Sequence, residues 1–209
     1  MYADDSKIYG EATTQELRKQ IQTDLDRLVD WAKKWQMNFN AGKCHVMHLG
    51  HNNLKEEYDM VETSGENRVK LEPTTEETDL GVIVDKDLTF TKHITSKVNK
   101  ANRLVGLIRR SFSYLDKDSM RTLFTAIVRP HLEFGNVAWS PHHKKYINMI
   151  EKVQRRATKC VPGMKDKEYE ERLREMNLPS LVKVDRRKRG DLIEVYLSIH
   201  MTTMMLTRI

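Results

Sequence analysis

The stretch TDLGVIVDKDLTFTKHI, residues 78–94, separates two parts of the chain that differ in their pattern of apolar residues. Before it, short runs rich in β-branched residues alternate with turn-forming residues, which is typical of strands. After it, apolar residues recur every three or four positions, which is the period of an amphipathic helix. This change predicts an α+β fold with a mixed domain at residues 1–90, an all-helical domain at residues 91–200 and a tail at residues 201–209.

The first domain is predicted to contain one long helix of about 22 residues. Thr13 or Thr14 is the predicted N-cap, and Glu16 places a carboxylate in the first turn. The apolar stripe of this helix consists of Leu17, Ile21, Leu25, Leu28, Ala32 and Trp35.

The rest of the first domain predicts short strands. A hairpin with a tight polar tip is predicted at residues 2–9, and a strand at residues 44–49. The runs EYDMV (57–61) and RVKLE (68–72) flank a turn-rich segment, and DLGVIV (79–84) follows them. We therefore expect the helix to pack on a small antiparallel sheet.

The second domain is predicted to be a series of helices. The first has the stripe Ile94, Val98, Ala101, Val105, Ile108 and Phe112, and the second contains Met120, Phe124, Ile127 and Val128. Pro130 should end or kink the second helix. Further helices are predicted at residues 143–159, 165–176 and 181–200.

Charge is distributed unevenly between the two domains. Residues 1–90 contain 11 Lys and Arg against 18 Asp and Glu, a net charge of −7, whereas residues 91–209 contain 25 against 12, a net charge of +13. A polarised chain of this kind favours contact of the second half with a polyanion, although solvated helix faces would give the same counts. No apolar run approaches the ~20 residues of a membrane span, and no signal peptide is evident, so an intracellular protein is expected.

Asp4 and Asp5 are adjacent carboxylates at the tip of the predicted N-terminal hairpin. Paired aspartates in a turn are commonly just solvated turn residues. The alternative is a divalent-metal site, because Mg²⁺ prefers carboxylate oxygens and phosphoryl-transfer sites hold two metals about 4 Å apart.

The sequence also resembles the reverse transcriptases of non-LTR, LINE-type retrotransposons of the jockey and chicken-repeat kind. YADD at residues 2–5 resembles their catalytic C motif, and LVDWAKKWQMNFNAGKCHVMHLG (28–50) resembles the segment into and through the D motif. Residues 78–94 resemble the primer-grip segment and the entry to the thumb. TAIVRPHLEFGNVAWSP (125–141), IEKVQRRATKCVPG (150–163) and RRKRGDLIEVY (186–196) resemble the helical region that follows. The resemblance covers roughly residues 1–199 and implies the end of a polymerase palm followed by a thumb.

For the active site, the resemblance implies that Asp4 is the main catalytic metal ligand of this segment and that Asp5 neighbours it in the same acidic site. The metal would be Mg²⁺, or alternatively Mn²⁺. Tyr2 would lie beside the primer terminus, and Lys43 would occupy the place of the D-motif lysine that protonates pyrophosphate or stabilises phosphate charge. An ordinary solvent-facing turn lysine is the alternative for Lys43.

For nucleic-acid binding, the resemblance implies that Gly81 lies at the primer grip, where a residue without Cβ lets the backbone approach the primer. The partners would be an RNA template, a DNA primer and a dNTP. The predicted phosphate contacts in the thumb are Lys97, Arg103, Arg109 and Arg110. Residues 186–189 form a second basic patch that would equally suit nuclear import, so the nucleus and the cytoplasm are both expected locations.

A polymerase of this family also needs an A-motif aspartate and fingers, which would precede residue 1. We therefore expect a fragment of an RNA-directed DNA polymerase that is inactive by itself, because one side of the metal site is missing. The alternative is a non-enzymatic remnant that binds nucleic acid through its basic half.

Overall fold

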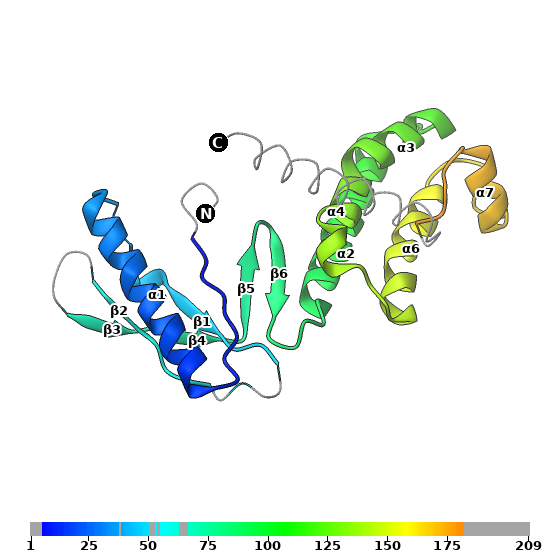
Figure 1. Ribbon diagram of the computed structural model, residues 1–209. Helices are drawn as coiled ribbons and strands as arrows, with labels where there is room; N and C mark the ends of the chain where they lie inside the picture. Colours follow the sequence, from blue (N-terminus) through cyan, green and yellow to red (C-terminus); the bar gives the residue numbers. More distant parts are fainter. Residues whose placement is uncertain (1–5, 38, 51–52, 54, 63–66, 182–209) are drawn as a thin grey trace, which may run out of the picture. The chain divides into compact units, whose positions relative to one another are not determined.

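The structure is a computed structural model that describes residues 6–37, 39–50, 53, 55–62 and 67–181. The chain divides into two compact units, one up to Leu88 and the other from Thr89 onward. The first unit mixes helix and strands and the second is helical (Figure 1), so the predicted α+β class is confirmed at this level.

The long helix of the first unit, α1, spans Gln15–Lys34. Thr14 is its N-cap, and the Thr14 side chain accepts a hydrogen bond from the backbone N–H of Leu17. The predicted apolar stripe is only partly buried, because Leu17 is 37% exposed and Trp35, which follows the last turn, is 60% exposed. The ends of the stripe therefore have little apolar cover within this unit.

The strands of the first unit are short and form three separate pairs. They are β1 (His45–Met47), β2 (Asp59–Val61), β3 (Arg68–Lys70), β4 (Glu72–Thr74), β5 (Glu76–Asp79) and β6 (Val82–Asp85). The pairs β2–β3 and β5–β6 are antiparallel, whereas β1–β4 is parallel. The prediction of one small antiparallel sheet was therefore wrong among the described residues, because the pairs do not join and one of them is parallel.

The predicted N-terminal hairpin is described only in its second arm. Residues 6–9 form no strand there, and Lys7 instead forms an ion pair with Asp79 of β5. The tip of the predicted hairpin lies outside the described residues.

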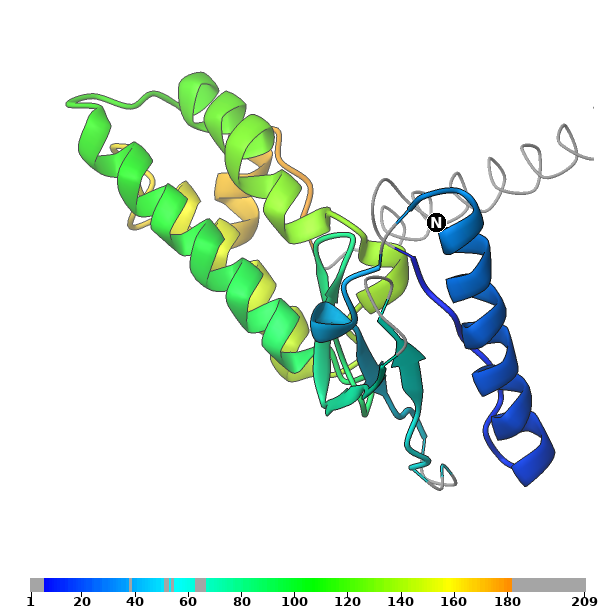
Figure 2. The same ribbon diagram turned by 90° about the vertical axis from the view of Figure 1, so that its left-hand side faces the viewer.

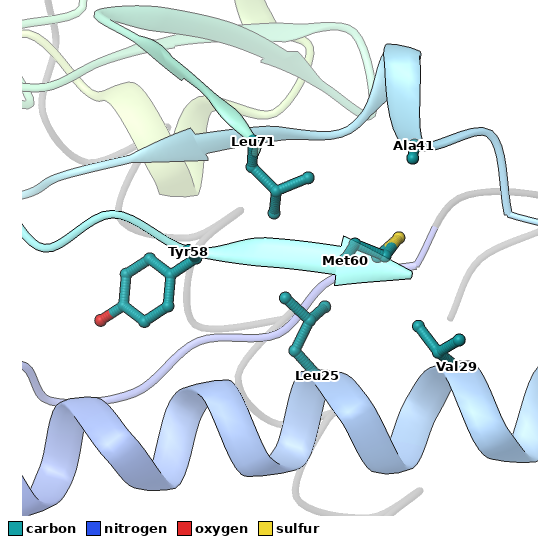
Figure 3. Close-up of a cluster of buried hydrophobic side chains, with 6 residues drawn as sticks. All are labelled: Leu25, Val29, Ala41, Tyr58, Met60 and Leu71. Atoms are coloured by element: carbon teal, nitrogen blue, oxygen red, sulfur yellow. The ribbon is translucent and has the colours of Figure 1, made fainter. Parts of the chain in front are cut away.

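A small apolar core joins α1 to the strands (Figure 3). It is built from Leu25, Val29, Ala41, Tyr58, Met60 and Leu71. Gln22 adds a polar link from α1 to β2, because its side-chain N–H donates to the carbonyl of Asp59 at 2.9 Å. The backbone N–H of Asp59 donates in return to Gln22 Oε1 at 3.2 Å, so one amide satisfies both backbone groups of a strand residue.

The second unit consists of packed helices (Figure 2). They are α2 (Thr91–Ser111), α3 (Lys117–Leu123), the π-helical η2 (Phe124–Val128), α4 (Arg129–Glu133), α5 (Asn136–Trp139), α6 (Lys144–Thr158) and α7 (Tyr169–Glu175). Buried apolar side chains from α2, η2, α4 and α6 form the core, and Trp139 is 2% exposed within it. Residues 182–209, with the last predicted helix, the second basic patch and the tail, lie outside the described residues.

Two predictions about these helices need correction. Phe112 does not extend the buried stripe of α2, because it is the C-cap in an extended conformation and is 46% exposed. Pro130, which was predicted to end or kink its helix, does not end it but lies in the first turn of α4, directly after a π-helical segment. The π-helical residues just before it accommodate the ring, since the hydrogen bond from Arg129 N–H already reaches back five residues to the carbonyl of Phe124.

Among the residues that the structure describes, no helix is long and apolar enough to cross a membrane.

Candidate nucleic-acid interface

The residues predicted to hold metal are not placed by the structure. Asp4 and Asp5 lie outside the described residues, and so does Tyr2, which was predicted to lie beside the primer terminus. Within the described ranges, no three His, Cys, Asp or Glu side chains are grouped so that they could bind a metal ion. The metal site therefore remains a prediction.

Lys43 and Gly81 both lie in turns of the first unit. Lys43 ends η1, a short 3-10 helix at Ala41–Lys43, and its side chain is exposed. Gly81 and Leu80 form the two-residue turn between β5 and β6, with φ values of +81° and +46°. Two successive positive φ angles are the signature of a type I′ hairpin turn, so this conformation by itself accounts for the glycine.

The four basic residues predicted on α2 point in three directions. Arg103 and Arg110 are two helical turns apart and exposed, on the face opposite the buried stripe. Lys97 lies toward α4, with its Nζ 5.8 Å from the centre of the Phe134 ring. Arg109 lies toward the end of α6, because its charge acts on the thiol of Cys160.

A second cationic surface, on α6, was missed in the sequence. The signal was present, because basic residues at spacings of seven, four and three positions share one helical face. These exposed residues are Lys145, Lys152, Arg156 and Lys159.

The two cationic helices lie side by side (Figure 2). The guanidinium of Arg156 on α6 donates to Asn102 Oδ1 on α2 at 3.3 Å, and the hydroxyls of Thr91 and Tyr146 are 2.7 Å apart. Burial raises the pKa of the Cys160 thiol, while the positive charges of Arg109 and Arg156 oppose that shift. We call the exposed sides of these two neighbouring helices, with their lysines and arginines, the α2–α6 face.

Carboxylates are excluded from the α2–α6 face. Helix α2 contains six Lys and Arg and no acidic residue. The only acidic residue of α6, Glu151, is buried and accepts hydrogen bonds from the hydroxyls of Tyr169 and Ser180. No described carboxylate pairs with Arg103, Arg109 or Arg110.

Several basic residues elsewhere in the second unit form ion pairs. Lys117 of α3 and Lys167 both pair with Glu175 of α7. Within α3, Arg121 lies 3.3 Å from Asp118. The unit therefore distributes its charges unevenly, with mixed signs around α3 and α7, whereas Arg103, Arg109 and Arg110 of α2 form no ion pair with a described carboxylate. Such a surface matches the regular negative charge of a nucleic-acid backbone.

Comparison with known proteins finds similarity to three polymerases of mobile elements. The chain is 29% identical over 170 residues to an RNA-directed DNA polymerase from the mobile element jockey of Drosophila funebris. It is 24% and 26% identical to probable RNA-directed DNA polymerases from the transposons X-element and BS of Drosophila melanogaster. No protein-family model matches the chain, and no solved structure matches it.

The matches to these three proteins cover 77–78% of this chain but only 18% of each relative. The chain therefore spans less than a fifth of the length of the curated relatives. Within that span, the predicted resemblance to the RNA-directed DNA polymerases of jockey-like non-LTR retrotransposons is confirmed.

Proposed function

We propose that this chain is a segment of a retrotransposon reverse transcriptase in which the α2–α6 face holds the template–primer duplex by its phosphates. The observation that carries this proposal is the sorting of charge in the second unit. Exposed arginines and lysines gather on two adjacent helices that carry no exposed carboxylate, whereas Lys117, Arg121 and Lys167 of the same unit form ion pairs. The names of the relatives supply the context of RNA template and DNA primer.

Binding through this face would be tolerant of sequence. Contacts to phosphate fix the position of a duplex but do not read its bases. Arg103 and Arg110 share one face of α2, and Arg156 continues the positive surface on α6. We therefore expect similar affinity for RNA·DNA hybrids of unrelated sequence.

A pair of matched double variants tests the proposal. Replacing Arg103 and Arg110 by Gln should weaken binding of the full chain to an RNA·DNA hybrid by about tenfold or more at low salt. Replacing Lys117 and Arg121 by Gln removes the same charge from ion-paired positions and should change affinity by less than about twofold. Equal losses in the two variants would contradict a defined binding face and indicate attraction by net charge alone.

We propose that the first unit contributes Asp4 and Asp5 to a Mg²⁺ site in the parent polymerase, with Mn²⁺ as a substitute. Lys43 would act on the phosphates of the dNTP, Tyr2 would contact the primer end and Gly81 would lie near the primer strand. Carboxylates from at least one further segment would be needed to hold two metals. We therefore expect no processive primer extension by the 209-residue chain. Extension with Mg²⁺ that disappears in Asp4→Ala would contradict this expectation.

A second candidate is a nucleic-acid-binding protein without enzymatic activity. It is favoured by one observation, namely that every described residue of the α2–α6 face belongs to the second unit. On this account Asp4→Asn and Asp5→Asn leave affinity unchanged both with and without Mg²⁺. On the polymerase account, Mg²⁺ should tighten binding of a primer–template with a matching dNTP, and Asp4→Asn should remove that gain.

A further inference from the structure

Two aromatic side chains are exposed just beyond the end of α2. The local sequence is RRSFSY, residues 109–114, in which Phe112 is 46% and Tyr114 is 71% exposed. Neither ring contacts another described aromatic ring or a described cation. The third exposed aromatic ring among the described residues of this unit, Phe134, instead has Lys97 beside it.

The segment that carries the two rings is anchored at both ends. On one side Ile108 of α2 is buried, and on the other side Leu115 is 5% exposed. Asp116 then caps α3, because its carboxylate accepts hydrogen bonds from the backbone N–H and the hydroxyl of Ser119, both at 2.8 Å. The rings therefore project from a short connection between two fixed points, which lowers the entropy lost when they bind a ligand.

The charges around the rings favour an anionic ligand. Arg109 and Arg110 immediately precede the segment and are exposed. The nearest acidic side chain in sequence, Asp116, already has its oxygens occupied by the helix cap. Aromatic rings next to unpaired arginines form the usual platform for unpaired nucleotides, since bases stack on the rings while the arginines contact phosphates.

We propose that residues 109–114 bind unpaired nucleotides of a single-stranded segment, with bases stacked on Tyr114 and Phe112. The phosphate contacts of Arg109 and Arg110 rest on the proposed function, but the stacking does not. In a duplex the faces of the bases are covered by their neighbours, so only a single strand offers them to a protein ring. The site thus separates unpaired template from the duplex held by the rest of the α2–α6 face.

The test compares three probes with the full chain: a single-stranded oligoadenylate of about ten nucleotides, an abasic strand of the same length and a blunt RNA·DNA hybrid. The unmodified chain should bind the oligoadenylate about tenfold more tightly than the abasic strand. Tyr114→Ser combined with Phe112→Ser should remove that difference and leave affinity for the blunt hybrid unchanged, whereas Tyr114→Phe should keep it. Tyr9→Ser, which removes a more exposed tyrosine from the first unit, is the matched control and should have no effect.

Equal affinity of the unmodified chain for the oligoadenylate and the abasic strand would overturn the proposal, even if the hybrid still bound. The effect of the double variant Arg103→Gln and Arg110→Gln on hybrid binding tests only the proposed function, and it does not test the stacking of bases on Tyr114 and Phe112. A measurement on the unmodified chain avoids any dependence on variant folding: 2-aminopurine in the single strand should be quenched on binding, because stacking on a ring quenches its fluorescence. Binding without quenching would also overturn the proposal.

Discussion

Gly81 and Gly106 show how the backbone decides what a single substitution does. Gly81 has φ of +81° in the β5–β6 turn, whereas Gly106 lies inside α2 with open space where a Cβ would project. We predict that Gly81→Ala destabilises the chain by about 1 kcal/mol or more, and that Gly106→Ala stabilises it by about 0.5–1 kcal/mol. Urea unfolding of the two variants checks this, and shifts of the same sign would contradict it.

Leu80 precedes Gly81 and is strained, because a leucine with φ of +46° occupies a region that favours Asn or Gly. Leu80→Asn is therefore expected to stabilise the hairpin by about 0.5–1 kcal/mol. The leucine is also 53% exposed, so packing does not explain it. If Leu80→Asn proved destabilising in urea unfolding, the turn assignment would be wrong.

His93 is fully buried at the start of α2, with its ring centre 5.1 Å from that of Trp139. Burial, with a smaller effect of Lys97, lowers its pKa from 6.5 to about 4. As the pH falls, His93 takes up a proton near pH 6.5 in the unfolded chain but only near pH 4 in the folded chain. The contribution of neutral His93 to the free energy of unfolding is therefore complete above pH 6.5 and is lost as the pH falls from 6.5 to 4.

The free energy of unfolding, measured by tryptophan fluorescence, should therefore fall by about 2 kcal/mol from about pH 7 to pH 5. His131 contributes in the same direction, because burial and the nearby Lys100 and Lys97 lower its pKa. His93→Gln should flatten the dependence more than His131→Gln does. An unchanged profile in His93→Gln would contradict the assignment.

At the scale of elements, α1 and β2 are joined by the paired hydrogen bonds of Gln22 with the backbone of Asp59. Gln22→Ala should destabilise the first unit by about 1–3 kcal/mol, because it leaves two partly buried backbone groups without that partner. Gln20→Ala is a matched control on the same helix, since Gln20 bonds only to the exposed Asp24. In thermal unfolding, the melting temperature of Gln22→Ala should be well below that of Gln20→Ala. Equal melting temperatures would contradict the role of Gln22 in joining α1 to β2.

How well each element could be predicted from the sequence depended on how local its cause was. The helix α2 was found from its apolar period, and the N-cap of α1 from Thr14, because both signals lie within a few residues. The antiparallel pair β2–β3 lies in the two runs that the sequence placed around a turn. The pairing of β1 with β4 was not found, since they are parallel partners 27 residues apart and no local pattern encodes their register. The π-helical turn before Pro130 was also missed, because the sequence shows the proline but not how the preceding turn adapts to it.

At the scale of the whole molecule, the sequence predicted the charge asymmetry and the family resemblance, and it named four of the six basic residues of α2. It did not show that α6 adds its own basic face beside them, because that depends on how two helices pack. The metal-site prediction at Asp4 and Asp5 could not be compared with geometry. In the relatives, the region that matches this chain is only a small part of a long polymerase. This chain is therefore best tested first for nucleic-acid binding.

The salt dependence of binding tests the central claim most directly. For the full chain and an RNA·DNA hybrid, the logarithm of the association constant should fall linearly with the logarithm of salt concentration. Replacing Arg103, Arg110 and Arg156 by Gln should reduce the magnitude of the slope by about 2–3, or roughly 0.9 for each phosphate contact removed. Replacing Lys117 and Arg121 should leave the slope unchanged. A slope that is the same in the triple variant as in the unmodified chain would contradict the assignment of the α2–α6 face.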